Sequence, residues 1–144
     1  YIQSGNVLLS SALDATSVTA KVEAALADNF TLDSAVKVLV LSEQQLSAVV
    51  HKKPLGFGKQ PDAYHSDVIF LLGITVAEAL KVFSPKEGVD TIWAGDGVVY
   101  SQRLSARRTE SRLSKIIGTS TYRSMTIRNW NTTTKLLALL QADS

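Results

Sequence analysis

The residues best suited to chemistry form a polar and basic cluster, Arg128–Lys135, that runs directly into a leucine-rich helical pattern. If a helix begins near Asn131, its first free backbone N–H groups belong to Thr132–Thr134. Lys135 lies four residues after Asn131 and therefore on the same edge of that helix. These donors and the positive end of the helix could bind a phosphate or carboxylate group. The alternative is that Asn131 only caps the helix while Trp130 packs beneath it.

A second basic feature precedes this cluster in the sequence. Arg108, Arg112 and Lys115 are spaced by four and three residues, so they form one positive stripe if residues 107–117 are helical. Such a stripe could follow a nucleic-acid backbone, although a solvated charged face has the same pattern. Residues 1–100 contain 7 Lys and Arg against 11 Asp and Glu, a balance of −4, whereas residues 101–144 contain 8 against 2, a balance of +6. This asymmetry indicates an anionic partner, unless the two halves neutralise each other in the fold.

No catalytic constellation is visible in the sequence. Without cysteine there is no disulfide, thiolate nucleophile or zinc–thiolate site, and His51 and His65 have no carboxylate pair at ligand spacing. No GxSxG motif supplies a hydrolase nucleophile. The glycine-bracketed loop around Phe57 lacks the GxxxxGK(S/T) spacing, so we expect Phe57 to pack this loop onto the core. We therefore expect no metal and no cofactor, and the sequence argues more against an enzyme than for one. If the protein is an enzyme, the candidates for its titratable group are Glu110, Asp67 and His65.

Length and composition indicate one globular domain, residues 1–144. Hydrophobic residues make up 45% of the chain and charged residues 19%. The longest apolar run, Val68–Ile74, has the length of a strand, and the sequence shows neither a membrane-spanning nor a signal segment. We expect a cytoplasmic protein with no membrane partner, and the sequence does not determine its oligomeric state. Because Tyr1 lies inside an expected strand, we also expect that an upstream piece of the chain is missing.

Hydrophobic periodicity and turn residues predict alternating strands and helices. The expected strands are Ile2–Ser10, Val36–Leu41, Ser66–Leu72, Val89–Ala94, Val98–Gln102 and Met125–Ile127, with a hairpin turn at Gly95-Asp96-Gly97. The expected helices are Ser17–Phe30, Ser42–Val50, Thr75–Val82, Arg107–Ile117 and Asn131–Gln141, with a turn or short helix at residues 119–124. Ser42 and Gln45 form a capping-box pattern, and residues 51–65 form a loop. This order favours an α+β fold, with a mixed or mostly antiparallel sheet and helices on one face, over a doubly wound parallel sheet.

Several motifs along the chain carry a family resemblance. They are Tyr1–Val7, Gly56-Phe57-Gly58, Asp67–Phe70, Ser111-Arg112-Leu113, and Arg128–Thr132 with Lys135-Leu136. In these motifs the chain resembles an uncharacterised, mainly bacterial family catalogued as domain of unknown function 1697. The resemblance implies ferredoxin-like α+β units, with subdomains at residues 1–55 and 66–144, and it implies no established activity. Family members also carry an upstream strand and helix, which supports the expectation that this segment is missing.

The principal hypothesis is a protein of unknown function whose basic C-terminal third forms an anion-binding surface for a phosphate or carboxylate group. The residues assigned to this surface are Gln3, Asn6, Arg112, Lys115, Arg128, Asn129, Asn131, Thr132 and Lys135. Gln3 and Asn6 are included on the assumption that the first strand lies beside the last helix. The alternatives are a nucleic-acid-binding module, an enzyme acting on a small phosphorylated or acidic substrate, and a purely structural or interaction protein.

Overall fold

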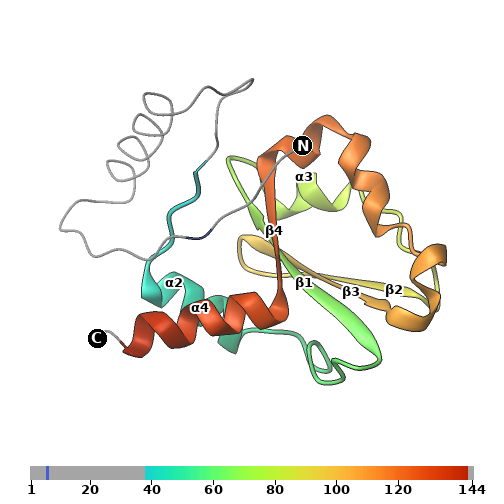
Figure 1. The fold of residues 1–144 in the computed structure, drawn as a ribbon. Coiled ribbons are helices and arrows are strands. Elements are labelled where there is room, and N and C mark those ends of the chain that lie inside the picture. Colours follow the sequence, from blue (N-terminus) through green and yellow to red (C-terminus); the bar gives the residue numbers. More distant parts are fainter. Residues whose placement is uncertain (1–5, 7–37, 143–144) are drawn as a thin grey trace, which may run out of the picture.

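The computed structural model describes residue 6 and residues 38–142 (Figure 1). The strand expected at Ile2–Ser10 and the helix expected at Ser17–Phe30 lie outside this part of the chain, apart from Asn6. The strand expected at Val36–Leu41 lies partly outside it, and its described residues, 38–41, form neither a helix nor a strand. The described elements begin with helix α2 (Glu43–His51).

Four antiparallel strands form the central sheet (Figure 1). They are β1 (Tyr64–Leu71), β2 (Asp90–Ala94), β3 (Val98–Leu104) and β4 (Met125–Asn129), in the spatial order β2-β3-β1-β4. β1 pairs with β3 on one side and with β4 on the other, so β2 and β4 lie at opposite ends of this sheet. All three pairings are antiparallel, which confirms the predicted α+β class with a mostly antiparallel sheet.

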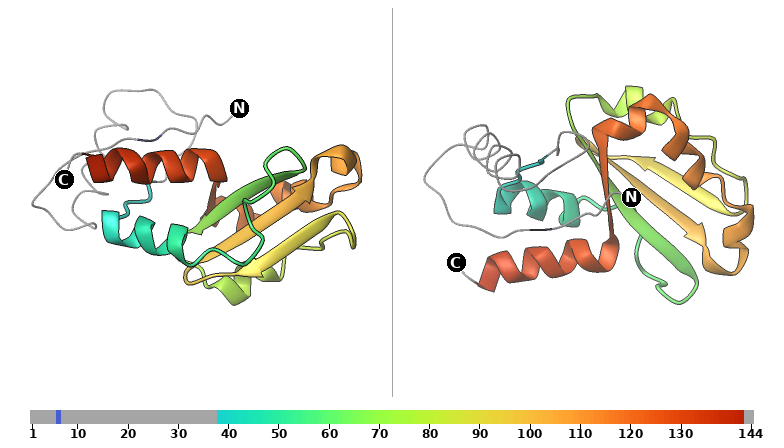
Figure 2. Two further views of the ribbon diagram at one scale, coloured as in Figure 1. Left: turned by 90° about the horizontal axis from the view of Figure 1, so that it is seen from below. Right: turned by 45° about the horizontal axis from the view of Figure 1, so that its top comes forward.

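The two long helices, α2 and α4 (Trp130–Ala142), lie side by side and pack on one face of the sheet (Figure 2). α2 begins with the predicted capping box. The Ser42 hydroxyl accepts from the Gln45 amide at 3.1 Å, and the Gln45 side chain accepts from the Ser42 amide at 2.8 Å. Residues from both helices and from β1 and β3 form the core on this face, namely Leu46, Val49, Leu137, Val68, Phe70, Val98 and Tyr100.

The opposite face of the sheet is covered by short elements. They are α3 (Val76–Leu80) and two 3-10 helices, η2 (Leu113–Gly118) and η3 (Ser120–Ser124). A third 3-10 helix, η1 (Ser105–Glu110), follows β3 and has no buried residue. Ala79 of α3 and Ile116 of η2 pack here against Ile69 of β1. The expectation of helices on one face therefore holds for α2 and α4, and it is wrong for the shorter elements.

The continuous helix expected at Arg107–Ile117 is wrong, because the chain forms η1 and η2 with a break at Ser111 and Arg112. The carboxylate of Asp90 explains the break. It accepts from the Ser111 hydroxyl at 2.6 Å and from the Arg112 and Lys86 amides at 2.8 Å each. An α-helix would require the Arg112 amide to bind the carbonyl four residues earlier. The Asp90 residue is only 8% exposed, so these three bonds offset the cost of burying its charge.

The loop between α2 and β1 is fixed to the core by Phe57, as the sequence predicted. Phe57 is fully buried, and the rings of Trp93, Tyr100 and Trp130 surround it edge-on at centroid distances of 5.7, 5.2 and 5.1 Å. Gly58 has a φ of +75°, and a Cβ atom there would lie 2.6 Å from two atoms of the Trp130 ring. Glycine at this position therefore permits both the turn and the close approach of the first residue of α4.

Candidate functional site

The start of α4 differs from the expectation in one important detail. The helix begins at Trp130, and its cap is Asn129, whose Oδ1 accepts from the Thr132 amide at 2.7 Å. The hydroxyls of Thr133 and Thr134 donate to the backbone carbonyls of Asn129 and Asn131, at 2.9 and 3.0 Å. The expected donors at Thr132–Thr134 are therefore largely engaged. In a helix that begins at Trp130, the amides of Trp130, Asn131 and Thr132 have no carbonyl partner inside the helix. The Thr132 amide is bound by the Asn129 side chain, so those of Trp130 and Asn131 are left for a ligand.

Arg128 connects the beginning of the chain to the end of β4. Its Nε donates to the Asn6 Oδ1 at 2.8 Å, and its Nη1 donates to the Thr126 hydroxyl at 3.0 Å and to the Ile127 carbonyl at 2.9 Å. Partial burial lowers the pKa of the Arg128 guanidinium. The contact brings Asn6 beside β4, whereas Gln3 lies outside the described residues.

The other side chains expected on this part of the surface are accessible. Asn131 and Lys135 are exposed, one helical turn apart on the same edge of α4, and Thr132 is half-buried. We use the name β4–α4 junction for six residues at the end of β4 and the start of α4: Asn6, Arg128, Asn129, Asn131, Thr132 and Lys135. Its basic and amide side chains belong to residues in or next to the first turns of α4, a helix end whose dipole favours negative charge.

Two of the expected residues lie elsewhere in the molecule. Arg112 is held by Asp90 of β2, and η2, which contains Lys115, packs on the face of the sheet opposite to α2 and α4. Strands in a sheet are about 4.8 Å apart, so β2 and β4, with two strands between them, are separated by roughly 14 Å. The structure therefore divides the predicted surface into a β4–α4 group and a separate group around η2.

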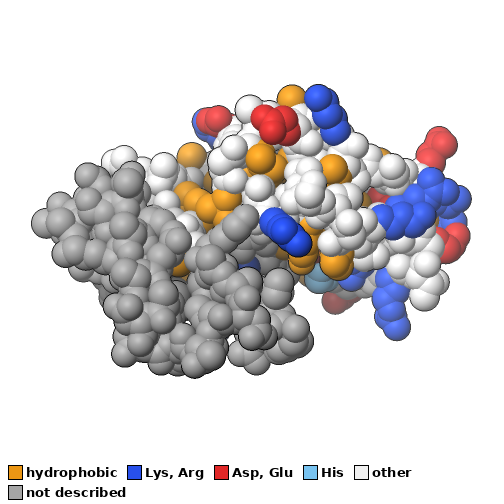
Figure 3. All heavy atoms as spheres, turned by 90° about the horizontal axis from the view of Figure 1, so that it is seen from above, with side chains coloured by type: hydrophobic (Ala, Val, Ile, Leu, Met, Phe, Trp, Pro, Cys, Tyr) orange, Lys and Arg blue, Asp and Glu red, His pale blue; other side chains and the backbone are white. Residues whose placement is uncertain are grey.

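The expected basic stripe is also interrupted. Arg108 belongs to η1 and Lys115 to η2, so the three residues do not share one α-helical face. Arg107 forms a two-bond ion pair with Glu110, at 2.8 and 2.9 Å. Figure 3 shows Lys and Arg side chains gathered with acidic ones at the right-hand end of the view. This region is a mixed surface rather than a continuous positive track.

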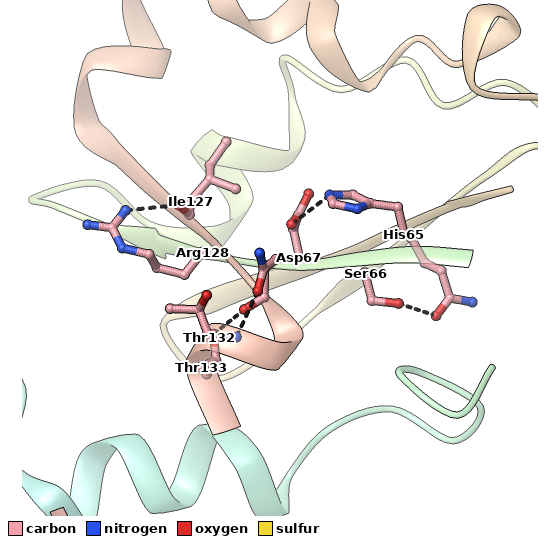
Figure 4. A network of polar contacts seen from close by, with 9 residues as sticks. His65, Ser66, Asp67, Ile127, Arg128, Thr132 and Thr133 are labelled. Carbon is pink, nitrogen blue, oxygen red and sulfur yellow. Dashed lines mark hydrogen bonds and ion pairs between the residues drawn. The ribbon is translucent and has the colours of Figure 1, made fainter. Parts of the chain in front are cut away.

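One polar pair near the junction was missed by the sequence reasoning. His65 and Asp67 are two residues apart on β1, and Nε2 of His65 lies 3.1 Å from Oδ1 of Asp67 (Figure 4). The Asp67 side chain is 17% exposed and that of His65 is 43% exposed. Burial raises the pKa of Asp67, although the nearby His65 and Arg103 act in the opposite direction. The two-residue spacing places both side chains on one face of a strand, which was the available signal.

The register of the sheet places this pair next to the junction. Asp67 of β1 is the cross-strand partner of Asn129, the cap of α4. In Figure 4 the Arg128 side chain extends away from His65 and Asp67, as expected for a residue that alternates with Asn129 along β4. The junction therefore has the Arg128 guanidinium on one side and the Asp67 carboxyl on the other.

Metal and membrane sites find no support in the described part of the chain. No group of three or more His, Cys, Asp or Glu residues among residues 6 and 38–142 could hold a metal ion. In the same residues, no helix has the length and apolar character needed to cross a membrane.

The geometry can now be compared with known proteins. Residues 1–100 match the family described as protein of unknown function (DUF1697). The chain belongs to this family. This confirms the resemblance that the sequence motifs indicated, and the matched range ends before β4 and α4. No curated protein matches the sequence.

A solved structure supports the fold. It is described as a conserved bacterial protein from Streptococcus pneumoniae, and the two chains share 22% sequence identity with a TM-score of 0.78. The similarity covers 97% of this chain and 78% of the other. At this level of identity the comparison shows a shared fold, and the family description assigns no ligand or reaction.

Proposed function

We propose that the protein binds a small molecule through a phosphate or carboxylate group at the β4–α4 junction. The observation that carries this proposal is the hydrogen bond between Arg128 Nε and Asn6 Oδ1, at 2.8 Å. It joins residues that are 122 positions apart and fixes the side chain of Arg128, two residues before the start of a 13-residue helix. A fixed cation beside the positive end of a helix is a favourable environment for an anion.

Each group at the junction has a distinct role in this proposal. The amides of Trp130 and Asn131 donate to the anion, because the helix provides no carbonyl for them. Lys135 supplies a mobile positive charge one turn further along the exposed edge. Arg128 contributes positive charge at a fixed position, since its Nε and Nη1 are held by Asn6 and by β4 itself. The Asn6 and Asn131 amides can read polar groups on the rest of the ligand.

A small anion fits this arrangement better than a nucleic acid does. A nucleic-acid track requires several cations along one surface, and its affinity falls steeply with salt as counterions are released. Arg112 is bound to Asp90 of β2, Lys115 belongs to η2 on the face of the sheet opposite to α4, and Arg107 is paired with Glu110. The remaining cations of the junction, Arg128 and Lys135, are enough for one anionic group.

An enzyme acting on a small phosphorylated or acidic substrate is a second candidate, favoured by the His65–Asp67 contact of 3.1 Å. A carboxylate that orients an imidazole is a common arrangement for acid–base chemistry. Glu110 is excluded from this role, because it is exposed, forms an ion pair with Arg107 and lies on η1. Turnover of a phosphate or carboxylate ester that is lost in His65→Gln but retained in His51→Gln would support the enzyme.

Binding at the junction can be tested by calorimetric titration with sulfate and with phenyl phosphate at constant ionic strength. Lys135→Ala is expected to weaken binding by about fivefold to tenfold, as for loss of one cation–anion contact. Lys115→Ala is the matched control, because it removes an exposed lysine of η2, on the face of the sheet opposite to α4, and should leave the affinity unchanged. Equal weakening by both substitutions would indicate a nonspecific charge effect and would refute the site.

A further inference from the structure

A cavity of about 320 Å³ lies between α2 and the end of the sheet that contains the end of β1 and the turn between β2 and β3. On the helix side it is lined by Gln45, Ala48 and Val49 of α2 and by the C-cap, Lys52. The spacing of these four residues places them on one face of the helix. The volume is at the lower end of the range of roughly 300–1,000 Å³ that is typical of small-molecule sites. The cavity can therefore hold a small ligand.

The floor of this cavity is part of the hydrophobic core. Val49, Phe70, Val98 and Tyr100 line it, and all four are buried. The Tyr100 hydroxyl donates to the Val49 carbonyl at 2.6 Å, so this hydroxyl and this carbonyl are satisfied within the protein. A ligand in the cavity therefore meets an apolar surface, which favours an apolar group over a polar one.

The exposed lining residues mark the mouth of the cavity, and they are polar. Nζ of Lys52 lies 3.4 Å from Oδ2 of Asp96 in the β2–β3 turn, and the two side chains are 62% and 84% exposed. Such an exposed ion pair contributes little to stability and opens at little cost. Gln45 is also exposed, and its Oε1 accepts from the Ser42 amide at 2.8 Å, which leaves its NH2 group as a donor.

The mouth has more donors than acceptors to offer a ligand. The Lys52 ammonium has further N–H groups besides the one directed at Asp96, and Gln45 adds its NH2 group. A ligand carboxylate can accept from both residues. Asp96 repels it only weakly, because the Asp96 side chain is mostly exposed and its charge is screened by solvent. A ligand amine would instead lie beside the Lys52 ammonium and compete with it for Asp96.

We propose that this cavity binds a small apolar monocarboxylate, an aromatic or short aliphatic acid. The apolar part of the ligand packs on Val49, Phe70 and Val98, and its carboxylate is held at the mouth by Lys52 and Gln45. The cavity shares no lining residue with the β4–α4 junction, so this inference goes beyond the anion site there and does not depend on it.

Benzoate tests the proposal, because it combines one aromatic ring with one carboxylate. An NMR titration near pH 7 at constant ionic strength, followed through the methyl signals, should show saturable shifts at Val49 and Val98. Benzylamine has the same ring with a positive charge and should bind at least about tenfold more weakly. Shifts that do not saturate with benzoate would overturn the site, and equal binding of benzylamine would overturn the assignment of a carboxylate.

Two variants with matched controls locate the ligand. Ala48→Leu fills the helix side of the cavity and should weaken benzoate binding by at least about tenfold, whereas the same change at the exposed Ala138 of α4 should leave it unchanged. Lys52→Gln should weaken binding by about fivefold to tenfold, and Lys59→Gln, in the following loop, should not.

Circular dichroism shows whether each variant is folded. Lys52→Gln alters only an exposed side chain, so it remains decisive if Ala48→Leu does not fold. Benzoate binding that is the same in Ala48→Leu and Ala138→Leu, or the same in Lys52→Gln and Lys59→Gln, would refute the proposal.

Discussion

Asn129→Ala isolates the structural role of the residue at the centre of the junction. The substitution removes the Oδ1 that accepts from the Thr132 amide at 2.7 Å, so one N–H of the first turn of α4 loses its partner. Loss of an N-cap costs about 0.5–2 kcal/mol. Asn129 is exposed, so water replaces the lost acceptor, and we expect a loss of about 1 kcal/mol rather than the larger cost of a buried unpaired donor.

Urea denaturation followed by circular dichroism measures this change as the free energy of unfolding. Asn131→Ala is the matched control, because this exposed asparagine lies within α4 and its side chain is not the cap. Asn129→Asp should keep the cap and the stability, and its added negative charge should weaken anion binding at the same helix end. Equal stability of Asn129→Ala and the unchanged protein would show that the cap does not stabilise α4, and the reasoning would fail.

Three further predictions concern the elements that support the site. Asp90→Ala removes three hydrogen bonds to one buried carboxylate and should lower the free energy of unfolding by at least about 3 kcal/mol, whereas the exposed Asp62→Ala should change it by less than about 0.5 kcal/mol, both measured by urea denaturation. Gly58→Ala should lower the free energy of unfolding by about 1–2 kcal/mol for its positive φ and by about 1–3 kcal/mol more for the clash with Trp130. Gly56→Ala has a positive φ but open space around it, so it should show only the first of these losses. Equal losses in the two variants would contradict the packing of Gly58 against Trp130. Folding raises the pKa of Asp67 above its ordinary value of 3.8, so between these two pKa values the native state binds more protons than the unfolded state. The contribution of Asp67 to the free energy of unfolding should therefore decline as the pH increases through that window. Unfolding measured across that range should show this decline in the unchanged protein and not in Asp67→Asn.

Local sequence signals predicted several elements because the contacts that define them are short-range. The capping box of Ser42 and Gln45, three residues apart, starts α2. The turn at Gly95-Asp96-Gly97 joins β2 and β3, and Phe57 between two glycines packs its loop onto the core. The last helix was placed within about two residues, and its cap was assigned to Asn131 rather than Asn129 because both asparagines flank Trp130.

Features that depend on distant residues were not predictable in the same way. The break between η1 and η2 is set by Asp90, which is 21 positions from Ser111 and 22 from Arg112. Periodicity alone treats residues 107–117 as one amphipathic helix, and it cannot register a carboxylate from another strand. The separation of Arg112 from Arg128 follows from the strand order, which no local pattern encodes.

The His65–Asp67 pair lies between these two cases. Its spacing of two on a strand was visible, and that spacing places both side chains on the same face. What the sequence did not show was the register that places Asp67 opposite Asn129, nor the burial that raises its pKa. A candidate site at this end of the sheet therefore required the pairing of β1 with β4.

An NMR titration of the protein with sulfate, at constant ionic strength near pH 6, tests the anion site through the backbone amide shifts. We expect saturable shifts that are largest at Trp130 and Asn131, whose amides have no carbonyl partner within α4, and small at Arg112 and Lys115. Shifts centred on η2, or shifts that increase linearly without saturation across the whole surface, would contradict an anion site at the β4–α4 junction.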